Sequence, residues 1–353
     1  MTFRVAIVGC GRLGQKYAEA YSTYPDTEIV AIAEHNDERR KAVGQRFGVK
    51  ALYNDVDSLL ADDVPDIVAI VTPTKFFKHA VIACAEAGVK GISTDKPIAG
   101  KLSDADEMVK ACESRGIVYA GGNLQRAMSE VQEASGMIKR GDFNSLIGAS
   151  VHRWSGEISG GGCQHISVLR LLTDAEVTEV IAWGSPADIL KSNNDDGLSI
   201  NGFFKMSNGI DCPVFSAETP FKGIDVWSDD SLVRWDWGPP ELYKGFNSHN
   251  ERIRISHDYA PYPWSEFFYL TSSIRSFLDV VKNGGSLSIS GHDLRQALEV
   301  AIAAKYSAKW GSVPLKLPLE DRSLELYPRT YRWVGGDMSG SPQPIDEVLG
   351  KES

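Results

Sequence analysis

The chain has 353 residues, of which 42% are hydrophobic and 24% charged, and its formal net charge is −10. This length predicts two domains, and the acidic balance argues against nucleic acid or an anionic membrane surface as the main partner. No apolar run reaches the roughly 18 to 20 residues that a membrane helix needs. Five scattered cysteines, an odd number, indicate reduced thiols and a cytoplasmic location.

The first element is the apolar stretch "FRVAIV", which runs straight into a turn and is therefore expected to be a strand and not a signal peptide. The turn "GCGRLG" fits the pattern G-x-G-x-x-G, and a helical pattern follows it. Such a turn lets the backbone approach a pyrophosphate, which then lies at the N-terminus of the helix. We therefore expect dinucleotide contacts from Gly9, Gly11, Arg12, Leu13 and Gly14.

A second predicted strand ends at Glu34, 20 positions after Gly14. A carboxylate at this distance accepts hydrogen bonds from the adenosine ribose diol and repels a 2′-phosphate, which favours NAD over NADP. Arg39 and Arg40 are the alternative, since they could bind a 2′-phosphate. We interpret both as solvated charges on a helix face.

Strands and helices then alternate as far as Gly122, which predicts a doubly wound parallel sheet with helices on both faces. Ligands of such sheets bind beyond the carboxyl ends of the strands. The loops "TPTKFF" and "TDKPI" both follow predicted strands. Thr72, Pro73, Asp95 and Lys96 are therefore expected on the cofactor side, and Pro97 is expected to restrict the backbone of Lys96.

The order of these motifs resembles the Gfo/Idh/MocA family, which includes glucose–fructose oxidoreductase and inositol dehydrogenase. The family's usual E-K-P appears here as Asp95-Lys96-Pro97, and "GGNLQRAMSEVQEASGMIKRGDFNSLIGASV" resembles the passage into its second domain. The resemblance implies a Rossmann domain over residues 1–122 and an α/β domain over residues 123–353. The second domain would have a large, mainly antiparallel open sheet and would serve substrate binding and oligomerisation.

One segment departs from the family pattern, in which an aspartate and, four residues later, a histidine follow three glycines. Here "SGGGCQHISVLRLL" has His165 and Arg170 but no aspartate at the matching place. Gln164 cannot replace a carboxylate electrostatically. Cys163 and His165 have the spacing of two metal ligands but no second pair nearby, so we expect no metal.

Oxidation of an alcohol by nicotinamide requires a group that removes the hydroxyl proton and a group that stabilises charge on oxygen. Lys96 is a compact cation suited to stabilising an alkoxide. His165 has an ordinary pKa near 6.5, suited to a general base, and a nearby ammonium would keep it neutral. The predicted catalytic residues are therefore Lys96 and His165. The predicted substrate contacts are Lys96, Asn123, Trp154, Gln164 and His165, with Asn123 also expected at the cofactor.

The segment 224–269 is rich in aromatic residues, among them Trp235 and Trp237. Their faces could pack on the C–H faces of a sugar, or they could form core or subunit contacts. His249 and His257 could reach a substrate but are more typical of solvated loops. The tail after Tyr331 has a linker composition and is interpreted as a surface arm.

These observations predict a cytoplasmic NAD-dependent oxidoreductase that interconverts a secondary alcohol and a ketone on a sugar, a glycoside or another sugar derivative, or a cyclitol. The resemblance implies a homodimer or homotetramer. Two alternatives stay open. The first is a cofactor-binding protein that has lost dehydrogenase activity and binds a sugar or a protein. The second is an enzyme whose nicotinamide stays bound and is recycled within one turnover.

Overall fold

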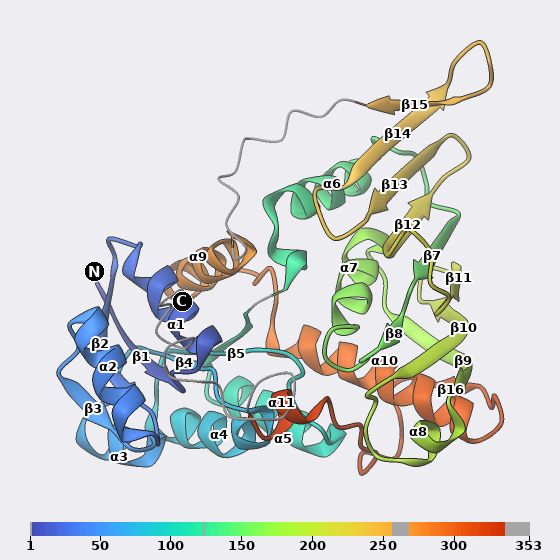
Figure 1. Cartoon of the computed structure of the whole chain (residues 1–353). Helices are drawn as coiled ribbons and strands as arrows, with labels where there is room; N and C mark the ends of the chain where they lie inside the picture. Colours follow the sequence, from blue (N-terminus) through green and yellow to red (C-terminus); the bar gives the residue numbers. More distant parts are fainter. Residues whose placement is uncertain (1, 123, 256–267, 336–353) are drawn as a thin grey trace, which may run out of the picture. The chain divides into compact units, whose positions relative to one another are not determined.

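The computed structural model describes residues 2–122, 124–255 and 268–335, and it divides into two compact units (Figure 1). Within the described residues, unit 1 comprises residues 2–122, 270–295 and 329–335. Unit 2 comprises residues 124–255, 268–269 and 296–328. The first unit therefore includes two segments from the last quarter of the chain, which the sequence analysis assigned to the second domain.

Unit 1 is built on a six-stranded parallel sheet with the strand order β3-β2-β1-β4-β5-β6. The order reverses between β1 and β4, so the carboxyl ends of these strands flank the switch point where such sheets bind ligands. The expected parallel Rossmann sheet is confirmed. Its strands are β1 (Phe3–Val8), β2 (Thr27–Ala33), β3 (Ala51–Tyr53), β4 (Ile67–Ile70), β5 (Gly91–Thr94) and β6 (Val118–Gly121).

Two helices of unit 1, α2 and α4, have ends set by capping residues. The side chain of Asn36 caps α2, and left-handed glycines at Gly48 and Gly88 end α2 and α4. The later helix α9 packs on β5, because Phe277 fills the space above Gly91. The helical elements are α1 (Arg12–Ser22), α2 (Asp37–Phe47), α3 (Val56–Asp62), η1 (Thr74–Phe76), α4 (Phe77–Ala87), α5 (Leu102–Glu113), α9 (Phe268–Asn283) and α11 (Thr330–Trp333).

Unit 2 has a ten-stranded sheet in the order β15-β14-β13-β12-β7-β11-β10-β9-β16, with β8 paired to β10. Only the β11–β7 pair is parallel among the described pairs, so the expected mainly antiparallel sheet is confirmed. The strands are β7 (Gly148–His152), β8 (Ser155–Gly156), β9 (Val177–Ser185), β10 (Leu198–Met206), β11 (Asp211–Val214), β12 (Gly223–Trp227), β13 (Ser231–Trp235), β14 (Glu241–Phe246), β15 (Arg252–Ile255) and β16 (Leu315–Lys316).

One face of this sheet is covered and the other is partly open. Helix α7 (Cys163–Thr173) packs on β7 and β12, and the inward residues Ile224, Val226 and Trp235 are fully buried. On β9 and β10 the outward residues Trp183 and Phe203 are about half exposed. The remaining helical elements are η2 (Gln125–Ala127), α6 (Ser129–Lys139), α8 (Ala187–Lys191) and α10 (Gly291–Lys309), which begins in unit 1 and continues in unit 2.

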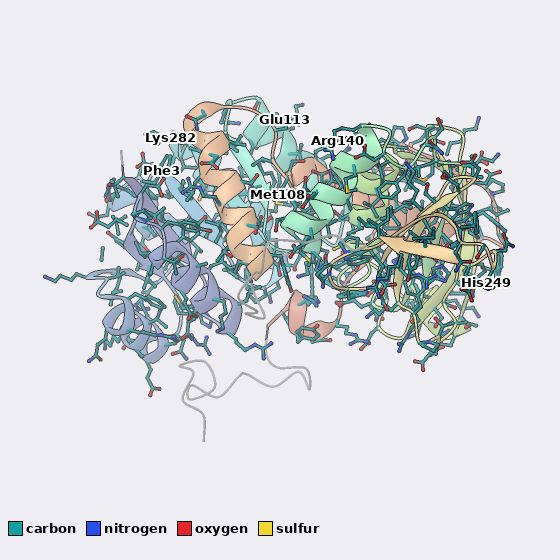
Figure 2. The ribbon with its side chains drawn as sticks, turned by 90° about the horizontal axis from the view of Figure 1, so that it is seen from above. Phe3, Met108, Glu113, Arg140, His249 and Lys282 are labelled. Carbon is teal, nitrogen blue, oxygen red and sulfur yellow. The ribbon has the colours of Figure 1, made fainter. Side chains whose placement is uncertain are left out.

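Of the two loop histidines, the structure describes only His249. His249 lies exposed in the turn between β14 and β15 (Figure 2), as a solvated loop histidine would. His257 and residues 336–353 lie outside the described residues. Among the described helices, none combines the length and the apolar composition that crossing a membrane would require.

Candidate active site

The glycine-rich turn joins β1 to α1, and two of its glycines are sterically required. Gly9 has φ +92°, and a Cβ on it would lie 2.8 Å from the carbonyl oxygen of Val71. A Cβ on Gly14 would overlap the carbonyl oxygen of Gly9, so α1 can approach the turn this closely only with glycine there. The turn thus has the close backbone packing that pyrophosphate binding by this motif uses.

The other predicted residues of the turn lie nearer to solvent. Gly11 precedes α1, and a Cβ on it would meet no atom within 4 Å. Arg12 is exposed and Leu13 partly buried. Among the described residues, no side chain caps the first turn of α1, so its N–H groups remain available to an anion.

Glu34 follows β2 and reaches back to the glycine-rich turn. Its Oε2 accepts a hydrogen bond from the backbone N of Cys10 at 2.8 Å, and its Oε1 accepts one from the backbone N of Asn36 at 2.9 Å. The side chain is buried. The carboxylate is therefore fixed beside the turn, where the sequence places the adenosine ribose.

Arg39 and Arg40 are not solvated, and our interpretation of them was wrong. Arg39 Nη1 lies 3.4 Å from Glu34 Oε1, and Arg40 Nη1 donates to the Glu34 carbonyl oxygen at 2.7 Å. Their side chains are 15% and 12% exposed. Asn36 caps α2 directly after β2, so the first turn of α2, which carries Arg39 and Arg40, lies at the end of β2. The charge pattern of the helix does not reveal these contacts.

These contacts sharpen the cofactor prediction. We expect NAD to bind at least about tenfold more tightly than NADP, because Glu34 would repel a 2′-phosphate. Glu34→Ala should narrow this gap, since Arg39 would lose its carboxylate partner and face the phosphate. Calorimetric titration with both dinucleotides measures it, and Glu34→Ala/Arg39→Ala is the control that should lose the gain for NADP. Preference for NADP in the unaltered protein would contradict the assignment of Glu34.

The loops after β4 and β5 place four predicted residues at the same edge of the sheet. Val8, Ile70 and Thr94 are neighbours in register at the ends of β1, β4 and β5, so the chain after each of them begins at the same edge. Thr72 and Pro73 follow β4 and are partly buried, while Asp95 and Lys96 follow β5 and are buried, Lys96 to 8% exposure.

Lys96 Nζ lies 3.4 Å from Asp95 Oδ1, and the Lys96–Pro97 peptide bond is cis, which the sequence left open. Asp95 is thus a direct neighbour of the Lys96 ammonium. Asn123 lies outside the described residues, so its assignment to cofactor and substrate stays a prediction.

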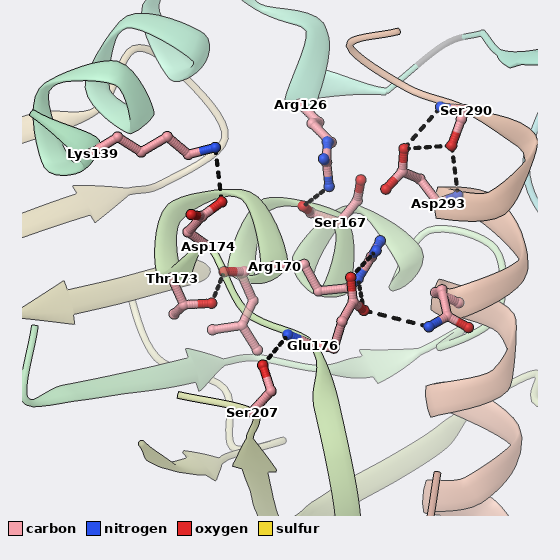
Figure 3. Close-up of polar contacts among 12 residues, drawn as sticks. Arg126, Lys139, Ser167, Arg170, Thr173, Asp174, Glu176, Ser207, Ser290 and Asp293 are labelled. Atoms are coloured by element: carbon pink, nitrogen blue, oxygen red, sulfur yellow. Dashed lines mark hydrogen bonds and ion pairs between the residues drawn. The ribbon is translucent and has the colours of Figure 1, made fainter. Parts of the chain in front are cut away.

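His165 lies in the first turn of α7, and polar contacts fix this helix in unit 2 (Figure 3). Arg126 Nη1 donates to the carbonyl oxygen of Ser167 at 3.1 Å. Arg170 forms two hydrogen bonds of 2.6 Å with the carboxylate of Glu176. Arg126, which lies outside α7, and Arg170, in the last turn of α7, therefore both hold the helix that carries His165.

The ring of His165 is enclosed by two indoles. Its centroid lies 5.9 Å from that of Trp235 and 5.7 Å from that of Trp237, both edge-on, and the two indoles stack on each other at 5.6 Å. The residue is 2% exposed, and neither ring nitrogen has a hydrogen-bond partner of good geometry among the described residues, although backbone groups of His152 and Gly162 lie close enough to act on its pKa. Burial, and next the charge of Lys222, lower the pKa of His165 from 6.5 to about 3. His165 is therefore neutral at physiological pH, the form that a base needs.

The low pKa of His165 predicts a loss of stability in acid. The unfolded chain takes up a proton that the folded protein lacks, so stability is complete above pH 6.5 and falls as the pH drops toward about 3. His165→Gln cannot take up this proton. The free energy of unfolding of the wild type, minus that of the variant, should fall by about 2 kcal/mol between roughly pH 8 and pH 5. Urea unfolding followed by tryptophan fluorescence measures it; identical pH dependence would contradict the prediction.

Gln164 and Trp154 support the glycine turn before α7. Gln164 is buried, and its Oε1 accepts from the backbone N of Gln125 at 2.9 Å. Trp154 is fully buried, packs edge-on against Phe204, and donates from Nε1 to the Gly162 carbonyl at 3.1 Å. These contacts give both residues a structural role beneath His165, beside the substrate contact predicted for them.

Three residues that the sequence analysis did not single out lie around this turn and helix. Asp195 Oδ2 accepts from the backbone N of Ser159 at 2.6 Å, and burial raises the pKa of Asp195 to about 7. Glu157 Oε2 accepts from the backbone N of Gly161 at 3.2 Å. Lys222 is the third. Only tertiary contacts identify these residues, since no local motif marks them.

The five cysteines are buried, and none forms a disulfide within the described part of the chain. Burial raises the pKa of Cys84 and Cys112 to about 12, so both are unreactive thiols at neutral pH. No group of three or more His, Cys, Asp or Glu suited to a metal ion occurs in the part of the chain that the structure describes.

Comparison with known proteins finds similarity chiefly in unit 1. Residues 3–122 match the model of the Gfo/Idh/MocA oxidoreductase family, described as having an NAD-binding Rossmann fold. D-apiose dehydrogenase of Paraburkholderia graminis is 37% identical over 115 residues, which are 33% of this chain and 30% of that protein. Myo-inositol 2-dehydrogenase of Thermotoga maritima is 28% identical over 134 residues, 37% of this chain and 40% of that protein. The matched segments thus span well under half of these relatives.

A solved structure extends the similarity of the fold to both units. An oxidoreductase from Agrobacterium radiobacter, in complex with NAD+, L-tartaric acid and magnesium, aligns with a TM-score of 0.73 at 21% identity. The alignment covers 90% of this chain and 98% of that one. Residues 3–122 are thus similar to the NAD-binding Rossmann domain of the Gfo/Idh/MocA oxidoreductase family, and the fold of both units is similar to that of a solved oxidoreductase.

Proposed function

We propose that the protein is an NAD-dependent oxidoreductase that interconverts a secondary alcohol and a ketone on a sugar, a sugar derivative or a cyclitol. NAD accepts or returns the hydride when it is bound. His165 removes the hydroxyl proton, and the Lys96 ammonium stabilises the negative charge that develops on the oxygen.

The main support for this proposal is the environment of His165. A neutral imidazole that lies edge-on against two stacked indoles can accept a proton from a substrate, although a pKa of about 3 makes it a weaker base than an imidazole of ordinary pKa. The relatives named as dehydrogenases of D-apiose and myo-inositol support the choice of a sugar or cyclitol.

The cellular location and the oligomeric state of the protein are also part of the proposal. Five buried cysteines without a disulfide among the described residues support a reducing, cytoplasmic location. The half-exposed Trp183 and Phe203 on the outer face of β9 and β10 support a homodimer or homotetramer built on that face. Light scattering of the purified protein measures the assembly, and a monomer at all concentrations would contradict it.

The activity is tested by following nicotinamide absorbance with NAD and a panel of sugars, glycosides and myo-inositol. Formation of NADH with at least one of them is expected. Denaturing the protein and assaying the supernatant for nucleotide detects a cofactor that stays bound and is recycled. If neither NADH formation nor bound nucleotide is detected, the alternative of a binding protein without dehydrogenase activity is favoured.

A further inference from the structure

Lys222 and Trp237 face each other at one end of β12 and β13. The register pairs Ile224 of β12 with Trp235 of β13, and next to this pair the backbone N of Lys222 donates to Asp236 Oδ1 at 3.0 Å. Trp237 has a positive φ of 58°, so its side chain is placed by contacts and not by strand alternation: its ring lies 5.6 Å from that of Trp235 and 5.7 Å from that of His165. Lys222 Nζ lies 4.1 Å from the centroid of the Trp237 ring. The ammonium therefore lies beside the indoles that enclose His165.

This cluster has hydrogen-bond donors without acceptors. Nε1 of Trp235 and Nε1 of Trp237 are buried and have no hydrogen-bond partner among the described residues, and Trp235 is fully buried. A buried polar group without a partner destabilises the folded protein, and a ligand that supplies acceptors removes this penalty. The two indole N–H groups therefore indicate a bound group with acceptor oxygens.

The charge of the cluster indicates that this group is an anion. Lys222 is half-buried, and it forms no ion pair within the described part of the chain. Burial and the charge of Arg153 lower the pKa of Lys222, while the exposed Asp236 raises it less. A desolvated ammonium bonds an anionic oxygen more strongly than a neutral hydroxyl. The positive charge of Lys222 is only partly compensated by the face of Trp237.

We propose that Lys222, Trp235 and Trp237 form a subsite for the carboxylate of an acidic sugar, with His165 beside it. This inference rests on the proposed function, because it names the substrate class of the same site. The ammonium and the two indole N–H groups supply donors for the carboxylate oxygens. A carboxylate fits better than a phosphate. Arg153 Nη2 lies 3.7 Å from Glu218 Oε1, which leaves Lys222 to balance one negative charge.

The test is a pair of titrations of the NAD-loaded protein with D-glucuronate and D-glucose, which differ by the carboxylate, followed by calorimetry and indole fluorescence. Glucuronate should bind about tenfold more tightly, the scale of one charge-assisted hydrogen bond. Lys222→Met should abolish most of this preference, Lys222→Arg should keep most of it, and Trp237→Phe should weaken glucuronate binding in part. Lys191→Met, an exposed lysine of α8 in the same unit, is the matched control and should change nothing.

Equal affinity for the two sugars, binding of neither, or a preference that survives Lys222→Met would overturn the subsite. Tighter binding of glucose 6-phosphate than of glucuronate would overturn its assignment to a carboxylate. The outcome is separable from the proposed function. Binding of glucuronate through Lys222 without NADH formation on any sugar would leave the subsite standing and refute the oxidoreductase. NADH formation on neutral sugars, with an unchanged KM in Lys222→Met, would support the oxidoreductase and refute the subsite.

Discussion

Replacing His165 with alanine is expected to lower turnover by about 10²- to 10⁴-fold, the scale of general base catalysis. The reason is that alanine removes the ring nitrogens, which lie against Trp235 and Trp237 and would accept the proton. Steady-state kinetics with the best substrate of the panel, compared with the unaltered protein, measures the loss.

The pH profile separates a base from a packing residue. Because the pKa of His165 is about 3, the kcat/KM of the wild type should show no loss from His165 between roughly pH 8 and pH 5, and its acid limb should vanish in His165→Ala. His165→Gln keeps most of the side-chain volume and should lose similar activity. His249→Ala, in the exposed β14–β15 turn, is the control. Near-normal turnover in His165→Gln would assign the histidine to packing alone.

Replacing Lys96 with methionine should lower turnover by roughly 10²- to 10³-fold while leaving NAD affinity nearly unchanged. One preorganised donor to a developing alkoxide contributes on this scale in the transition state and little to cofactor binding. Lys96 is buried at the end of β5 with its ammonium 3.4 Å from Asp95. Single-turnover kinetics and calorimetric titration with NAD measure the two effects separately.

Lys50→Met, at an exposed position of unit 1, is the matched control for Lys96→Met and should change neither quantity. If Lys96 and His165 act on the same hydroxyl, the double variant should be impaired far less than the product of the single effects, because groups that act as a unit are not additive. Full multiplicativity would show that they act on different steps. Normal turnover in Lys96→Met would remove Lys96 from the mechanism.

The sequence alone predicted the parallel sheet of unit 1 and the placement of Glu34 and Lys96 after its strands. These features are local. A turn that requires glycine, and apolar strands followed by helices, are both recognised from residues that are adjacent in the sequence. The same reasoning missed the contacts of Arg39 and Arg40 with Glu34 and Asp37, because a charge pattern along a helix does not say what the helix end faces.

In unit 2 the sequence determined that His165 begins a helix after a glycine turn and that aromatic residues follow later in the chain. Which aromatic residues enclose His165 was decided by tertiary structure. Trp154, near in sequence, lies in the core, while Trp235 and Trp237, some 70 residues away, lie against the ring. The pairing of β12 with β13 and the packing of α7 on β12 bring Lys222 and these indoles to His165. Register and packing between distant segments are not encoded in any local pattern, because they depend on how the whole sheet assembles.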